Sequence, residues 1–164
     1  MREIEFRGQE IDSGKWLFGS LAHYKDDDSY YINYTDEYGD DIGTMVVPET
    51  VGQFTGYITK DNVKVYEGDI VEFETNVNCI TSEIKPYWKD CYEKQCEIGG
   101  GTWWVRKDQA IVQWDRVNGM WALKVYNNGR YKRKSKLFTY RASGYVVVGN
   151  IFDNKELINE RDTF

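Results

Sequence analysis

The stretch of residues 66–73, with the sequence YEGDIVEF, constrains the fold of this 164-residue chain more than any other. Gly68 suits the backbone of a tight turn, and the side chain of Asp69 is able to accept hydrogen bonds from the amides of that turn. The β-formers Ile70, Val71 and Phe73 follow directly. A glycine-aspartate pair before apolar residues is typical of the first strand of small SH3-like barrels. We therefore expect a turn at Gly68 and the first barrel strand directly after it.

The composition favours a mainly β fold. Aromatic residues make up 16% of the chain, and 15 glycines stand against 2 prolines, which suits many short strands joined by turns. We expect an N-terminal β-subdomain over residues 1–60. An SH3-like small barrel with a short C-terminal helix should follow over residues 61–164.

Hydrophobic alternation and turn residues place the individual strands. In the first half we expect a hairpin over residues 2–22, whose first strand ends at Gly8, and strands over 30–34 and 44–47. In the second half, the Asn118-Gly119 pair between two apolar runs predicts a hairpin. The β-branched run 146–151 should be a buried strand that closes the barrel, and Asp153 or Asn154 should cap a helix beginning near Lys155.

Five short motifs occur in order along the chain: FRG at residues 6–8, WLFG at 16–19, TVGQFTG at 50–56, YEGDIV at 66–71 and VGNIFDN at 148–154. Together they resemble the YopX family, known mainly from bacteriophages and prophages of Gram-positive bacteria. The resemblance implies a small β-rich phage protein, and no catalytic residues can be carried over from the family. The chain departs from the family pattern at Asn62-Val63, where a glycine is usual, and at Lys155, where a proline is usual. The motif positions that we expect to be structural are Gly52, Phe54, Gly56, Gly68, Asp69, Gly149 and Asn150.

The TVGQFTG motif is open to two interpretations. Its small and polar residues are compatible with a ligand-contacting loop that uses Gln53 and the threonines. Alternatively, Phe54 packs inward while Gly52 and Gly56 let the chain turn between domains. We favour the second interpretation, because glycines most often serve turns.

The candidate metal ligands do not form a recognisable metal site. Cys79, Cys91 and Cys96 lack the close spacing of zinc ligands, and the only histidine, His23, is distant in sequence. We expect free thiols. The acidic run 26–28 lacks the alternation and the distal glutamate of a calcium loop, so it should be a solvated loop tip.

Charge is divided unevenly along the chain. Residues 1–75 carry 6 basic and 17 acidic side chains, whereas residues 76–164 carry 15 and 10. This asymmetry suggests either head-to-tail association of subunits or a basic surface for an anionic partner. Basic residues concentrate in one segment with interleaved aromatics, so the candidate contacts for nucleic acid or a partner are Arg130, Tyr131, Lys132, Arg133, Lys134, Lys136 and Arg141. A solvated loop or a strand edge whose lysines discourage aggregation is the simpler interpretation of this segment.

Residues 76–107 have poor periodicity and read as a long insertion. Gly99, Gly100 and Gly101 within it lack the lysine of a phosphate-binding loop and suggest a hinge. Trp103 and Trp104 are compatible with base stacking, but tryptophans beside a strand are more often core or interface anchors.

No catalytic motif, cofactor motif or long apolar run is recognisable, so we expect a cytoplasmic, non-enzymatic protein of the host cell with no cofactor and no membrane contact. The favoured function is an oligomeric interaction or scaffold protein of phage origin. It would form homo-oligomers and bind a phage or host protein. The alternative is a nucleic-acid-binding accessory protein that uses residues 130–141.

Overall fold

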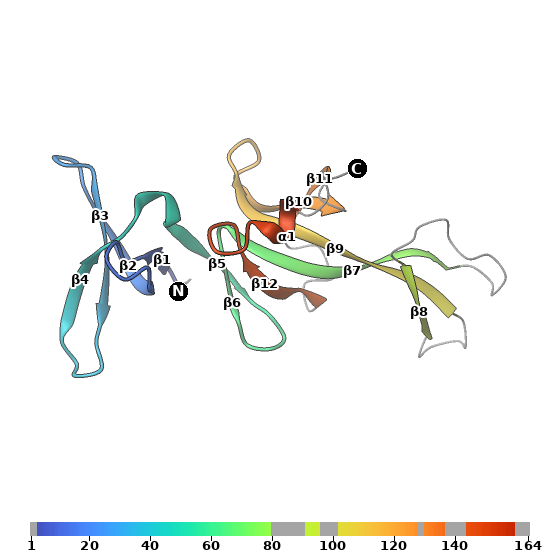
Figure 1. Cartoon of the computed structure of the whole chain (residues 1–164), viewed down its shortest axis with the longest axis horizontal. Coiled ribbons are helices and arrows are strands. Elements are labelled where there is room, and N and C mark those ends of the chain that lie inside the picture. Colours follow the sequence, from blue (N-terminus) through green and yellow to red (C-terminus); the bar gives the residue numbers. More distant parts are fainter. Residues whose placement is uncertain (1–2, 80–90, 96–101, 128–129, 137–143, 160–164) are drawn as a thin grey trace. The chain divides into compact units, whose positions relative to one another are not determined.

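A computed structural model describes residues 3–79, 91–95, 102–127, 130–136 and 144–159 of the chain. The chain forms two compact units, Met1–Asp69 and Ile70–Phe164. Each unit is built on one antiparallel sheet (Figure 1), and the prediction of a mainly β fold is confirmed. Whether residues 1–60 and 61–164 are independent domains stays a prediction.

The sheet of the first unit has the strand order β4-β3-β2-β1-β5-β6. A 3₁₀ turn, Pro48–Thr50, leads into β5. The strands are β1 (Phe6–Gln9), β2 (Trp16–Tyr24), β3 (Ser29–Thr35), β4 (Asp41–Met45), β5 (Gly52–Ile58) and β6 (Lys64–Tyr66).

The core of this unit is built on Leu17, Ile32 and Val46, and Phe6 and Tyr34 are among the side chains that pack against it. Val46 follows β4 and pairs with Glu10 in an isolated bridge. For this reason β4 ends at Met45, earlier than the predicted strand 44–47.

Gly8 continues β1, so the prediction that the strand ends there is wrong. It pairs with Leu17 of β2. A Cβ at this position would lie 2.9 Å from Cγ2 of the buried Val46. The glycine therefore serves the close approach of Val46 to the strand rather than a turn.

The sheet of the second unit has the order β11-β10-β9-β7-β12. Strand β8 lies outside this order and pairs with β9. Figure 1 shows β7 and β9 running side by side over much of their length. The strands are β7 (Asp69–Cys79), β8 (Cys91–Gln95), β9 (Thr102–Asp115), β10 (Met120–Asn127), β11 (Arg130–Lys136) and β12 (Val146–Asn150).

The predicted Asn118-Gly119 hairpin is confirmed. Asp115 of β9 pairs with Met120 of β10, and Gly119 has a φ of 60°. By contrast, the described part of residues 76–107 is more regular than we expected, since the end of β7, the whole of β8 and the beginning of β9 lie there. Long-range pairing between strands supplies the order that local periodicity did not reveal. The predicted glycine hinge at residues 99–101 lies outside the described residues.

The β12 run was predicted to be a fully buried strand, and this prediction is wrong. β12 ends the order of strands in its sheet, and Val146 and Val148 are 40% and 36% exposed. The sheet runs as an open path from β11 to β12 in the described part of the chain, so an SH3-like barrel is not confirmed. The predicted short helix is present as α1 (Glu156–Asn159), directly after Asn154 and Lys155.

Candidate functional site

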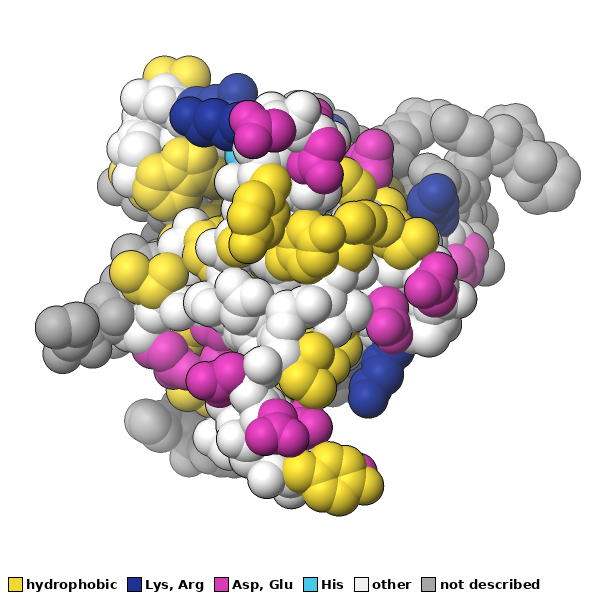
Figure 2. Space-filling view, turned by 90° about the vertical axis from the view of Figure 1, so that its left-hand side faces the viewer, with side chains coloured by type: hydrophobic (Ala, Val, Ile, Leu, Met, Phe, Trp, Pro, Cys, Tyr) yellow, Lys and Arg dark blue, Asp and Glu magenta, His cyan; other side chains and the backbone are white. Residues whose placement is uncertain are grey.

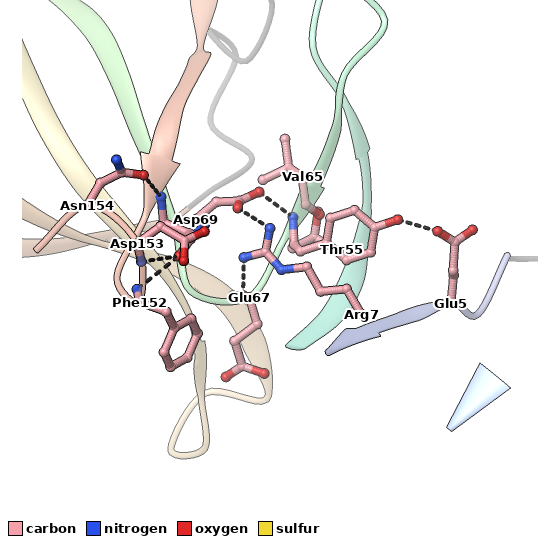
Figure 3. Close-up of polar contacts among 11 residues, drawn as sticks. Glu5, Arg7, Thr55, Val65, Glu67, Asp69, Phe152, Asp153 and Asn154 are labelled. Carbon is pink, nitrogen blue, oxygen red and sulfur yellow. Dashed lines mark hydrogen bonds and ion pairs between the residues drawn. The ribbon is translucent and has the colours of Figure 1, made fainter. Parts of the chain in front are cut away.

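Arg7 is the most heavily engaged charged residue of the first unit (Figure 3). Its Nη1 lies 2.5 Å from Oδ1 of Asp69, and its Nη2 donates a hydrogen bond of 3.0 Å to the carbonyl of Glu67. The guanidinium also lies 4.7 Å from the ring centre of Trp16 and 5.1 Å from that of Tyr66. Only 7% of Arg7 is exposed. Ion pairing and aromatic stacking make this burial tolerable.

Asp69 forms the other half of this ion pair and shapes the turn before β7. Its Oδ2 accepts a 2.7 Å hydrogen bond from the amide of Tyr66, and Gly68 has a φ of 83°. The prediction of a glycine turn whose amide is satisfied by Asp69 is therefore confirmed. Burial raises the pKa of the Asp69 carboxyl above its ordinary value, against the opposing effect of Arg7.

A second polar group lies next to this pair. Lys64 contacts the carboxylates of both Glu3 and Glu5, and the hydroxyl of Tyr66 donates a hydrogen bond to Glu5. Burial favours a higher pKa for Glu5, but the hydrogen bonds from Lys64 and Tyr66 lower its pKa below the ordinary value. Burial and the neighbouring Glu5 carboxylate raise the pKa of the Tyr66 hydroxyl.

These residues serve as a framework. Arg7, Asp69, Glu5 and Lys64 all satisfy their charges with one another, and they tie β1 to β6 and to the turn that precedes β7. Such an arrangement leaves no charged group poised for a substrate. We conclude that this cluster holds the unit together.

The remaining motif residues of the first unit are also structural. Phe54 is 2% exposed and its ring centre lies 5.6 Å from that of Tyr66. A Cβ at Gly52 would lie 2.6 Å from the carbonyl oxygen of Glu67. Gly56 has a φ of 83° and lies where the register between β5 and β6 shifts. The inward packing of Phe54 agrees with the interpretation that we favoured, although residues 52–58 form a strand rather than a turn between domains.

In the second unit the motif builds a turn after β12. The side-chain oxygen of Asn150 accepts hydrogen bonds of 2.9 Å from the amides of Phe152 and Asp153. A Cβ at Gly149 would lie 2.3 Å from Oδ1 of Asn154. The VGNIFDN motif is thus a side-chain-stabilised turn that leads to α1.

An acidic and aromatic face forms a more promising site on β2, β3 and β4. A cavity of about 500 Å³ opens there, lined by Tyr24, Asp26, Asp27, Ser29, Tyr31, Asn33 and Gly43. The rings of Tyr24 and Tyr31 meet edge to face at 5.3 Å. Figure 2 views the molecule from the side of β3 and β4, where hydrophobic side chains form a band with acidic side chains beside it. We call the cavity and the strands that carry it the acidic face.

The electrostatics of the acidic face favour cations. Ser29 donates hydrogen bonds to Asp27 through its hydroxyl at 2.6 Å and its amide at 3.2 Å, and these bonds lower the pKa of the Asp27 carboxyl. Asp27 therefore stays ionised beside the aromatic rings. Nearby, the single histidine, His23, contacts Asp28 at 2.7 Å. Residues 25–28 form the predicted loop tip between β2 and β3.

The predicted basic contacts fall on a different unit. Residues 130–136 form β11, which stands at one end of the strand order. The role of these residues, as contacts or as a solvated loop or strand edge, stays a prediction, and Arg141 lies outside the described residues. In the sequence, Asp26 and Asp27 were recognised only as part of a loop tip. The cavity went unnoticed because its other lining residues come from three strands that are brought together by pairing.

Two negative findings apply to the described residues. They include no group of three or more His, Cys, Asp or Glu side chains arranged to hold a metal ion. Nor do they include a helix long and apolar enough to span a membrane.

Comparison with known families is decisive for the identity of the chain. A family model described as YopX protein matches residues 5–159. The chain belongs to the YopX family. This YopX-family protein also resembles protein EF1440 from Enterococcus faecalis, a crystal structure, with 17% identity, a TM-score of 0.41, and coverage of 96% of this chain and 99% of that one. No curated protein matches it.

Proposed function

We propose that this YopX-family protein is a non-catalytic interaction protein that associates with itself head to tail. The acidic face of one copy would contact the basic strand β11 of the next. YopX is not a known enzyme family. A phage or prophage origin and a cytoplasmic location in the host are part of this proposal, as is a phage or host protein that binds the assembled form.

Charge complementarity carries the proposal. The first unit contains 6 basic and 15 acidic residues, whereas residues 130–136 contain five basic residues and no acidic one. Opposite surface charges accelerate encounter and fix which surfaces meet, and the effect weakens as salt screens it. The acidic face adds exposed aromatic surface, which is common at the centre of protein interfaces.

The contact would be heterologous because the two surfaces differ. Each copy then keeps one acidic face and one basic strand available for the next copy. Such contacts produce a ring if the rotation between copies closes and a filament if it does not.

Light scattering at low salt tests the proposal. We expect a mass above the 19.3 kDa of one chain, falling toward that value in high salt. The triple change Lys132→Gln, Arg133→Gln and Lys134→Gln should reduce association. A monomer under all conditions would overturn the proposal.

A matched control separates local charge from net charge. Changing the exposed Lys15, Lys25 and Lys60 to glutamine removes the same amount of positive charge, but from the acidic unit. This variant should associate as well as the parent or better. Equal loss of association in both triple variants would show that net charge alone matters and would overturn the proposed contact.

Nucleic-acid binding by β11 is the second candidate function. It is favoured by the same five basic residues and by Tyr131 among them, since phosphate contacts and base stacking need these side-chain types. We place it second because the net charge of −6 opposes the approach of a polyanion.

A further inference from the structure

In the described part of the chain, strand β4 has no strand paired with one side of its backbone. It pairs with β3 and ends the strand order of its sheet. Two hydrogen bonds just beyond the ends of this pairing fix which residues face β3: the amide of Val46 donates to Tyr30, and that of Asp36 donates to Asp40, each at 2.9 Å. Hydrogen-bonded pairs alternate along an antiparallel ladder. Ile42 and Thr44 therefore direct their backbone groups toward β3.

The alternate residues Asp41, Gly43 and Met45 direct their backbone groups away from β3. The carbonyl of Met45 accepts a hydrogen bond of 3.4 Å from the amide of Ile11. Among the described residues, no partner is seen for the other outward groups. These are the three amides and the carbonyls of Asp41 and Gly43.

The charged side chains at this edge are all acidic. Natural edge strands avoid pairing with other chains by means of lysines, prolines or bulges, and β4 has none of these between Asp41 and Met45. Its charges are Asp41 within the strand and Asp40 directly before it. Ile42 and Met45 are 36% and 38% exposed. Acidic strands are repelled from this edge, whereas a basic strand is attracted to it.

We propose that the open edge of β4 accepts β11 of a second copy as an added strand. This inference rests on the proposed head-to-tail association and specifies how the two surfaces join. β11 has seven residues, of which five are basic, and in the described part of the chain it pairs with β10 alone. Main-chain hydrogen bonds would supply affinity and the opposite charges would supply selectivity.

The cavity of the acidic face lies beside this edge. Gly43 belongs both to the edge strand and to the cavity lining, which also contains Asp26 and Asp27. A Cβ at position 43 would lie 2.6 Å from Oδ1 of Asn33. A glycine at position 43 therefore leaves room for the side chain of Asn33, which also lines the cavity. A lysine or arginine of the added strand would find carboxylates and aromatic rings there.

Amide hydrogen exchange followed by NMR tests strand addition directly. In dilute, high-salt solution the amides of Asp41 and Gly43 should exchange fast, while those of Ile42 and Thr44 should be protected by β3. At high concentration and low salt, exchange at Asp41 and Gly43 should slow by about tenfold or more, because hydrogen-bonded amides exchange only when they open. The triple glutamine variant of β11 should not show this protection.

The outcomes separate the two proposals. Association without protection of Asp41 and Gly43 would overturn strand addition and leave the head-to-tail proposal standing. No association in any condition would overturn both. If the amides of Asp41 and Gly43 are protected to the same extent at all protein concentrations, the strand that pairs with β4 does not come from a second copy, and the proposal is overturned.

A backbone variant gives an independent check. Asp41→Pro removes an outward amide at a sheet edge, where proline is tolerated, whereas Asp41→Ala keeps that amide and removes the same side chain. We expect Asp41→Ala to associate and Asp41→Pro to lose association at least in large part. Equal association of the two variants would contradict strand addition.

Discussion

Arg7 and Asp69 form an ion pair at 2.5 Å, with side chains that are only 8% and 2% exposed. The pair joins the first strand of the chain to the turn that precedes β7. Because both charges are removed from water, each depends on the other for compensation. The ion pair therefore links a residue of β1 to the residue that follows the Gly68 turn and begins β7.

The change Asp69→Asn tests this dependence. It leaves the guanidinium of Arg7 buried without its counter-charge, and we expect a loss of about 3–5 kcal/mol in the free energy of unfolding. Urea denaturation followed by tryptophan fluorescence measures the loss. The exposed Asp61 is the control, since Asp61→Asn should change stability by no more than about 0.5 kcal/mol. A loss at Asp69 as small as that of the control would contradict the structural role of the pair.

Tyr66 should make stability fall at high pH. Burial and the Glu5 carboxylate raise its pKa above the ordinary value of 10.0, so the folded protein keeps the phenolic proton after the unfolded chain has lost it. The contribution is complete below about pH 10 and is lost as the pH rises above it. Urea denaturation over this pH range should show a shallower decline for Tyr66→Phe than for the parent. Parallel declines would refute the prediction.

Gly19 should not tolerate a larger side chain. A Cβ there would lie 2.0 Å from the backbone oxygen of Asn33, and backbone atoms of a paired strand cannot move aside easily. We expect Gly19→Ala to lower the free energy of unfolding by about 3 kcal/mol or more, at the upper end of overpacking effects. Gly144→Ala provides the control, because nothing lies within 4 Å of a Cβ at that position. Thermal denaturation of both variants decides the matter.

Salt dependence tests the nucleic-acid alternative. If β11 contacts phosphates, the affinity for single-stranded DNA should fall steeply as salt rises, because each neutralised phosphate releases counterions. The triple glutamine variant of Lys132, Arg133 and Lys134 should then lower the slope by about three, one for each contact removed. Fluorescence anisotropy with labelled DNA gives both slopes. A parent protein that does not bind DNA at low salt would eliminate this function.

Local chemistry made several elements predictable from the sequence. The turn at Gly68 and the hairpin at Asn118-Gly119 follow from residues that are close neighbours in the chain, and both are present in the structure. The five ordered motifs were likewise visible as short segments of sequence, and together they identified the family. The partners of several of their residues, such as Asp69 for Arg7 and Val46 for Gly8, lie elsewhere in the chain. The acidic first half and the basic segment could likewise be read from composition alone.

Only tertiary structure decided the burial and the partners of particular side chains. The sequence did not reveal that Arg7 pairs with Asp69. Val146 and Val148 were expected to be buried, but β12 lies at the end of its sheet. The acidic face and the open edge of β4 arise in the same way, from the order in which strands pair. Strand order depends on contacts between residues distant in sequence, and hydrophobic patterning within one strand does not encode which neighbour that strand will have.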